Sequence, residues 1–452
     1  MQVITLLDYL LLPFVLAIIY LIAYKIRDTK YPPGHKWRAY FIPGLTAKIG
    51  GAIGIGLIYQ YYYGGIGDTV LYYRHAVIIN SAFDDSIDKW FNLIFHVPEW
   101  YDSNYYGQYI SKMEWYQAPT EYIVCSIIAF LGIFVFTTYL PMSVLLGTIA
   151  FTGIWALFRT FATKYPQFTK QIAIAVLFIP STIMWGSGIF KDTICIFGLG
   201  WLTYGAFRLL INRDFSIGAI ALVVLAVYFV GSIKVYILLA FLPALVMWIL
   251  FSYSYRIRSG FIRFLLSISV IGVVFAGFLV LSAKFETVLG KYSLENIQNT
   301  SMVTSTFIKS ISGDQGSAYD LGAIDFTPAG MLKKFPLAVN VSLFRPYIWE
   351  TRKPIQMLNA VEAFMFMWIT IKVLLVVGPR RTWATIKSDP TIQFCLIFAI
   401  IFAFSVGISS GNFGALSRYR IPCLPFYAMA VMFIFYSNNP LSKNIFSFSL
   451  KR

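Results

Sequence analysis

The sequence predicts an all-α fold, a polytopic bundle of about 11 to 12 transmembrane helices in a single domain over residues 1–452. Hydrophobic residues make up 58% of the 452 residues and charged residues only 12%. The mean hydropathy is +0.70. A soluble chain of this length could not enclose so much apolar surface in its core, so we expect a bilayer to cover much of it.

The spans can be placed because a helix needs roughly 17 to 25 mostly apolar residues to cross a bilayer. Eleven segments qualify: residues 5–24, 49–65, 142–160, 171–187, 191–211, 216–231, 234–253, 261–283, 357–378, 391–409 and 421–437. A further apolar segment, residues 121–139, is either a twelfth span or a re-entrant or incompletely spanning helix. The first segment lacks the basic start and the cleavage motif of a signal peptide, so we expect a retained helix.

Clusters of basic residues between the spans set the orientation, because cytoplasmic loops carry an excess of Lys and Arg. They are Lys25, Arg27, Lys30, Lys36, Arg38 and Lys48; Arg159, Lys164 and Lys170; Arg256, Arg258 and Arg263; and Arg380, Arg381 and Lys387. With eleven spans, all four clusters lie on the cytoplasmic side. A twelfth span at 121–139 would place the first cluster on the opposite side of the membrane from the other three. Clusters of this kind are typical of cytoplasmic loops that face anionic membrane lipids. They explain the net charge of +16, so we do not expect the protein to bind nucleic acid.

This topology leaves two large non-cytoplasmic loops, residues 66–141 and 284–356. The first interleaves acids with aromatic residues: Asp84, Asp85, Asp88, Glu99, Asp102 and Glu114 with Trp90, Phe91, Trp100, Tyr101, Trp115 and Tyr116. Amphipathic rings settle at headgroup level, so we expect interfacial or re-entrant helices there. The second loop is polar and Gly-containing at 310–317, and we expect that part to be mobile, as in binding loops.

Asp68 is the leading catalytic candidate. It follows the apolar segment 49–65 across a Gly-rich exit, where a membrane helix should emerge into water. Ionisable groups at membrane depth are costly and usually serve a pathway or a reaction. The structural alternative is a loop aspartate that ends a helix.

Three arginines are predicted to lie on the non-cytoplasmic side: Arg345, Arg418 and Arg420. Membrane proteins usually keep most of their arginines on the cytoplasmic side, so these three are exceptions. A guanidinium fork matches phosphate oxygens, so these residues are candidates for holding a lipid-linked phosphate or diphosphate. The alternative is that they reach external headgroups or pair with the loop carboxylates. The turn from Trp185 to Thr193 adds Lys191 and Asp192, which could instead form a local interfacial charge cluster.

The stretch Gly67-Asp68-Thr69-Val-Leu-Tyr-Tyr73 and the turn Arg418-Tyr-Arg-Ile-Pro422 resemble motifs of the GT-C superfamily of integral membrane glycosyltransferases. The turn before Asp192 and the run Phe344-Arg-Pro346 resemble bacterial membrane proteins of surface-polysaccharide assembly. Many superfamily members have a second acid directly after the first, whereas position 69 is Thr here. An extra N-terminal helix also precedes the motif-bearing one.

The resemblance implies transfer of a sugar from a polyprenyl-phosphate donor at the non-cytoplasmic face of a bacterial plasma membrane, in envelope glycan assembly. Asp68 would be the general base or would orient the acceptor. Arg418, Arg420, Arg345 and Lys191 would hold the lipid phosphate. The supporting residues would be Thr69, Tyr73, Asp192, Glu350 and Tyr419.

Three other functions stay open: a polymerase of lipid-linked oligosaccharides, a flippase or transporter, and a non-catalytic subunit of an envelope complex. A transporter is expected to place ionisable residues in the middle of spans. Lys234, Glu362 and Lys372 come closest, and each falls within about two turns of a predicted helix end.

No cofactor is required by this chemistry, and no metal ligands are assigned. A divalent metal is compatible with the first-loop acids but is not indicated, because His75 and His96 lack ligand spacing to Asp or Cys. Cys125, Cys195, Cys395 and Cys423 lie in apolar segments and are expected to be small core residues.

Overall fold

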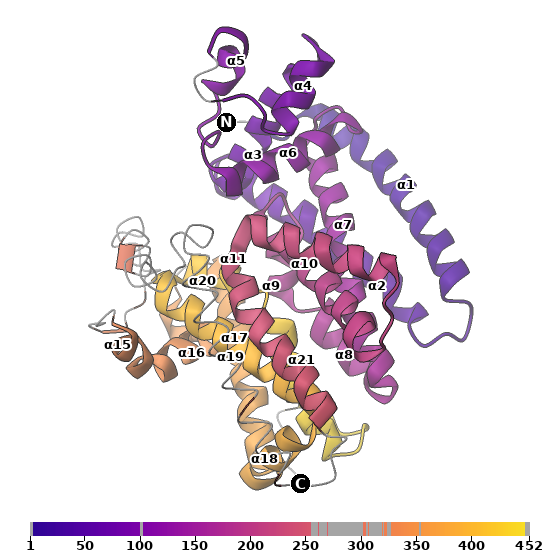
Figure 1. Cartoon of the computed structure of the whole chain (residues 1–452), viewed down its shortest axis with the longest axis vertical. Helices are drawn as coiled ribbons and strands as arrows, with labels where there is room; N and C mark the ends of the chain where they lie inside the picture. The colour runs from indigo at the N-terminus through magenta and orange to yellow at the C-terminus, as the bar shows by residue number, and fades with distance from the viewer. Residues whose placement is uncertain are drawn as a thin grey trace. The chain divides into compact units, whose positions relative to one another are not determined.

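The computed structural model describes residues 3–99, 103–254, 327–351 and 354–447, together with isolated positions between 261 and 322. Every regular element in this part of the chain is a helix, which confirms the all-α prediction (Figure 1). The predicted span 261–283 lies almost entirely outside the described residues, and so does the segment 310–317, for which mobility was predicted.

In the part of the chain that the structure describes, seven helices are long and apolar enough to cross a membrane. They are α1 (Leu6–Lys30), α2 (Arg38–Leu57) with its continuation η1 (Ile58–Tyr62), α7 (Tyr139–Lys164), α10 (Lys191–Ala206) with η3 (Phe207–Ile211), α11 (Ile217–Ser254), α17 (Pro354–Val376) and α19 (Pro390–Ser410). A bent pair, α20 (Phe413–Tyr419) and α21 (Leu424–Ser437), would make an eighth, with an angle of 70° between them.

The described part of the chain therefore holds fewer spans than predicted. The predicted spans 216–231 and 234–253 correspond to the two helices that meet within α11 at a kink at Lys234 (φ −142°, ψ 75°). The predicted span 171–187 is split into α8 (Thr169–Leu177) and α9 (Pro180–Trp185). Proline disfavours helical backbone in the residue before it, which explains the break ahead of Pro180.

The chain divides into two compact units. Unit 1 comprises Met1–Thr169, Thr182–Phe207 and Phe215–Lys234. At its centre α7 packs against α1, α2 and α10. Glycine permits the closest of these approaches: a Cβ on Gly200 would lie 2.0 Å from the carbonyl oxygen of Gly153. Small residues allow membrane helices to meet backbone to backbone in this way.

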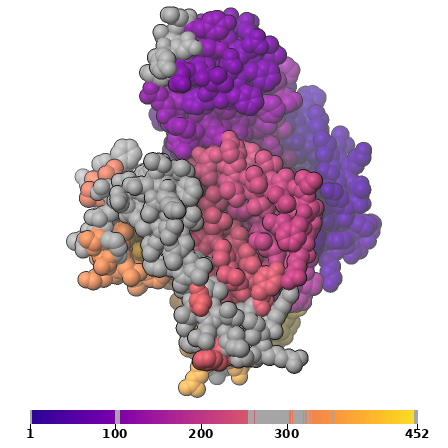
Figure 2. Space-filling model, in the orientation of Figure 1, coloured from indigo at the N-terminus to yellow at the C-terminus, as the bar shows by residue number. Residues whose placement is uncertain are grey.

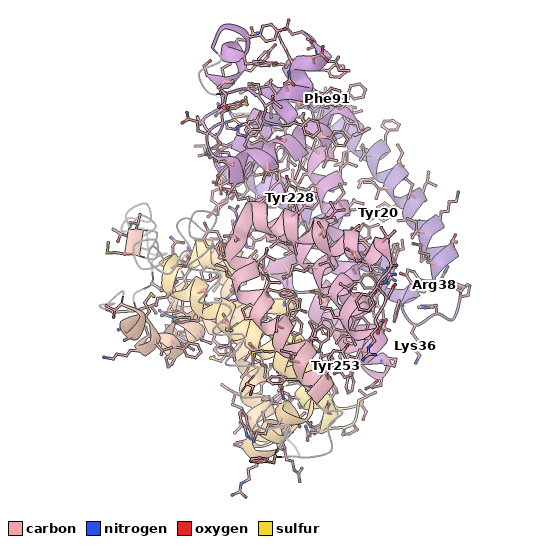
Figure 3. All side chains as sticks on the ribbon, in the orientation of Figure 1. Tyr20, Lys36, Arg38, Phe91, Tyr228 and Tyr253 are labelled. Carbon is pink, nitrogen blue, oxygen red and sulfur yellow. The ribbon has the colours of Figure 1, made fainter. Side chains whose placement is uncertain are left out.

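The first predicted loop forms four helices at one end of α7: α3 (Asp68–Ser81), α4 (Ile87–Ile94), α5 (Ser103–Ile110) and α6 (Pro119–Ile133) (Figure 1). Figure 2 shows the atoms of this segment in purple. The segment 121–139 does not form a spanning helix, because α6 has only 15 residues and a turn with positive φ at Phe136 and Thr137 follows it. Phe91 projects outward from α4 and is 46% exposed (Figure 3). The interfacial position of these helices stays a prediction.

Unit 2 comprises Lys170–Ser181, Arg208–Asp214 and Val235–Arg452. Here α19 packs against α16 (Phe335–Phe344), α21 and α18 (Pro379–Ser388). The short helices α15 (Pro328–Lys333) and η5 (Ile348–Glu350) flank α16. Aromatic rings fill the core: Trp248 stacks on Phe394 with centroids 4.6 Å apart, and Phe241 contacts Phe394, Phe398 and Phe426. All four cysteines are buried, as expected.

Candidate functional site

Asp68 is the first residue of α3 and is exposed. The chain reaches it through a turn in which Gly64, Gly65 and Gly67 all have positive φ. At Gly67 only glycine fits, because φ is 132° and a Cβ would lie 2.5 Å from the ring of Tyr59. The turn therefore reverses the chain directly after η1 and presents the Asp68 carboxylate to the surroundings.

The residues that follow Asp68 anchor the start of α3. Thr69 is fully buried, and its hydroxyl shares a 2.7 Å hydrogen bond with the hydroxyl of Tyr139 on α7. Tyr73, one turn further on, packs the edge of its ring against Tyr139 with centroids 5.4 Å apart. Burial, together with the nearby Asp8 carboxylate, raises the pKa of Tyr73 to about 12. Tyr73 is therefore protonated at neutral pH and cannot serve as a base.

Asp8 is a buried carboxylate that the sequence reasoning missed. One of its oxygens accepts a 2.8 Å hydrogen bond from the backbone N–H of Leu140. The other accepts from the N–H and the hydroxyl of Thr5 at 2.8 Å each. Asp8 therefore joins the start of α1 to the start of α7. An acid inside an otherwise apolar first span was the available signal.

Lys191 and Asp192, in the turn from Trp185 to Thr193, each have a charged partner elsewhere in unit 1. Lys191 forms an ion pair with Glu121 at the start of α6. Asp192 is fully buried and lies 2.5 Å from the ammonium nitrogen of Lys234. Burial alone would raise the pKa of Glu121, but hydrogen bonds from Lys191 and Thr120 hold that pKa below its ordinary value.

Lys48 was assigned to a cytoplasmic loop, and this was wrong. It lies inside α2, is 1% exposed, and donates hydrogen bonds to the carbonyl oxygens of Thr182 (2.9 Å) and Gly186 (2.8 Å). The ammonium thus satisfies backbone carbonyls around the C-terminal end of α9, the position where a cation is favoured by the helix dipole. The other residues of that cluster remain near the α1–α2 turn, where Figure 3 labels Lys36 and Arg38.

In unit 2, Arg345 and Glu350 form a side-on pair. The Arg345 Nε–H reaches both carboxylate oxygens at 3.0 Å, and a second guanidinium nitrogen also contacts Glu350. Glu350 additionally accepts from the N–H of Tyr347 at 2.8 Å. The Arg345 guanidinium lies over the ring of Phe413, 5.3 Å from its centroid. Glu350 therefore both neutralises and orients Arg345.

Arg420 is fully buried and has protein partners instead of an open face. One terminal nitrogen donates to the carbonyl oxygens of Ser342 (3.1 Å) and Arg345 (2.9 Å). The other lies 3.4 Å from Glu362, which accepts 2.7 Å hydrogen bonds from the N–H and hydroxyl of Ser181. Arg420 thus holds the backbone of Arg345, whereas its neighbours Arg418 and Tyr419 are half-exposed.

The predicted site residues consequently fall into two groups. Unit 1 contains Asp68, Thr69, Tyr73, Lys191 and Asp192, and unit 2 contains Arg345, Glu350, Arg418, Tyr419 and Arg420. Within the second group, Arg345 contacts both Glu350 and Arg420. Lys234 and Glu362, discounted because they lie near predicted helix ends, prove to be buried partners of Asp192 and Arg420.

Among the described residues, no group of three or more His, Cys, Asp or Glu side chains is arranged to hold a metal ion. Comparisons with protein-family models, with curated proteins and with solved structures find no match for this chain.

Proposed function

We propose that the chain is a membrane glycosyltransferase of the GT-C type, which moves a sugar from a polyprenyl-phosphate or diphosphate donor to an acceptor hydroxyl on the non-cytoplasmic side. The supporting observation is the placement of Asp68. Its carboxylate is exposed directly after a helix of spanning length, while the next residue, Thr69, is buried against α7. A carboxylate on a fixed backbone is what positioned acid–base catalysis requires.

In the proposed reaction the acceptor oxygen forms a bond to the anomeric carbon while the bond from that carbon to the phosphate oxygen breaks. Asp68 takes the hydroxyl proton, and the lipid phosphate leaves with the electron pair. Because Arg420 is fully buried, Arg418 first and Arg345 second are the candidates within unit 2 for a contact with a lipid phosphate, and Arg420 is the residue that positions Arg345.

The experiment uses the purified full-length protein in liposomes with a panel of decaprenyl-phosphate hexoses and an extract of lipid-linked glycans as acceptor. We expect release of decaprenyl phosphate from at least one donor, dependent on the extract, as measured by mass spectrometry. No release from any donor would contradict the proposal.

A flippase or transporter of lipid-linked saccharides is the second candidate, favoured by the buried Asp192–Lys234 pair. Lys234 is the residue at which α11 leaves helical geometry. Buried ionisable residues at breaks in membrane helices mark substrate or ion pathways in transporters. Movement of a fluorescent lipid-linked saccharide between liposome leaflets, without release of lipid phosphate, would favour this candidate.

A further inference from the structure

The helix α18 is a short amphipathic helix that presents a basic outer face. It has 10 residues and connects α17 to α19, both long and apolar enough to span a membrane. Figure 1 shows it at the end of these two helices in unit 2. A connection between two consecutive spans lies at a membrane surface, so the lengths and compositions of α17 and α19 predict that α18 lies at the level of lipid headgroups.

The inner face of α18 is fixed by hydrogen bonds. The Thr385 hydroxyl oxygen accepts a 2.9 Å bond from the side-chain amide of Asn438, beyond α21. The side-chain amide of Gln393 on α19 donates to the carbonyl oxygens of Ile386 (2.9 Å) and Lys387 (3.1 Å). Thr382 is buried on the same side. These contacts determine which side chains of α18 point away from unit 2.

The outer face carries cations and one large ring. Arg380, Arg381 and Lys387 are exposed, and Trp383 is 59% exposed. The Lys387 ammonium lies 5.4 Å from the centroid of the Trp383 ring, one turn earlier. A tryptophan among Lys and Arg on one helix face is typical of helices that lie in the headgroup layer, where the amphipathic indole is favoured.

Basic residues outnumber acidic residues in this region. Asp389 is the only acid between Glu362 and the C-terminus, and its side chain accepts a hydrogen bond from the N–H of Thr391 at the start of α19. Lys443, half-exposed on the segment after α21, adds a further cation. No carboxylate within α18 competes for the exposed cations, so a negatively charged surface is their complement.

We propose that α18 binds the headgroups of anionic phospholipids, with Arg380, Arg381 and Lys387 contacting the phosphates and Trp383 inserted at the same depth. The partner is the membrane's own anionic lipid. This inference is independent of the sugar chemistry proposed above. Each basic residue near an anionic surface strengthens binding by roughly fivefold.

The test is native mass spectrometry of the full-length protein in detergent, supplemented with equal amounts of phosphatidylglycerol and phosphatidylcholine. We expect preferential retention of phosphatidylglycerol. The triple variant Arg380→Gln, Arg381→Gln, Lys387→Gln should lose that preference by about tenfold or more. A variant with Arg380→Lys and Arg381→Lys keeps the charge and should keep the preference, which separates lipid binding from misfolding.

The matched control removes three exposed cations elsewhere, Arg74→Gln, Lys112→Gln and Lys333→Gln, and should behave as wild type. Equal retention of the two lipids by the wild type would overturn the proposal. So would an unchanged preference in the α18 triple variant, or an equal loss in the control, because net charge and not this helix would then account for binding.

Discussion

The ammonium nitrogen of Lys234 lies 2.5 Å from the carboxylate of Asp192, with the two side chains only 8% and 0% exposed. The pair joins the first turn of α10 to the one residue at which α11 leaves helical geometry. Charges buried in this way cost several kcal/mol each to remove from water, and the partner offsets that cost only when both are present.

Asp192→Asn should therefore destabilise unit 1 by about 3–5 kcal/mol, because it removes a buried negative charge 2.5 Å from the Lys234 ammonium. The double variant Asp192→Leu, Lys234→Met should recover most of that loss, since no charge remains. Thermal unfolding of the purified protein in detergent measures both. A double variant no more stable than Asp192→Asn would show that the ion pair is not the dominant interaction here.

The arginines of unit 2 should respond differently to substitution by Lys. Arg420→Lys removes hydrogen bonds to the carbonyl oxygens of Ser342 and Arg345, so it should lower the melting temperature. Arg418→Lys should leave folding intact and weaken binding of decaprenyl phosphate by about 1–3 kcal/mol, because the guanidinium fork is lost. Binding is measured in nanodiscs. Unchanged affinity in Arg418→Lys would remove Arg418 from the phosphate site.

Stability should depend on pH through Glu121. Its folded-state pKa lies below the ordinary value, so the Glu121–Lys191 pair contributes stability above the unfolded pKa and loses it as pH falls through the folded pKa. The melting temperature of the wild type should therefore fall towards that of Glu121→Gln as the pH falls from about 5 to below the folded-state pKa of Glu121. A constant difference between the two proteins over that range would contradict this assignment.

The orientation can be tested at two exposed positions. Lys36 lies in the turn between α1 and α2, and Asp84 follows α3, beyond the other end of α2 and η1. Single cysteines there, in a variant without the four native ones, should be labelled from opposite sides of the membrane by an impermeant thiol reagent, with position 84 outside. Labelling of both from one side would exclude the proposed topology.

Composition was sufficient to predict a helical membrane protein, and apolar runs located most of the long helices. The predicted helix boundaries were wrong where a helix contains polar residues. The N-terminal half of α2 contains Pro43, Thr46 and Lys48, so the predicted span began only at residue 49. Hydropathy also did not show the break ahead of Pro180, which divides the predicted span 171–187 into α8 and α9.

For the candidate site, the sequence could indicate which charged residues lie near the ends of spans, but not which residues they contact. Asp68 was identifiable because it follows an apolar segment. The partners of the other charges were not, since Asp192 meets Lys234 across 42 residues and Arg420 meets Glu362 across 58. Such pairs depend on tertiary packing, which periodicity and loop charge do not encode. The same limit explains why Arg420 resembled an external phosphate ligand in sequence.

The central claim is that Asp68 acts in sugar transfer, and the most direct measurement is the rate of decaprenyl phosphate release by Asp68→Asn in liposomes. The control is Asp84→Asn, which makes the same change at another exposed carboxylate of unit 1. We predict a loss of about 100-fold or more for Asp68→Asn, with unchanged folding and donor binding, and a wild-type rate for the control. A wild-type rate in Asp68→Asn would contradict the assignment and leave Asp68 as the residue that begins α3.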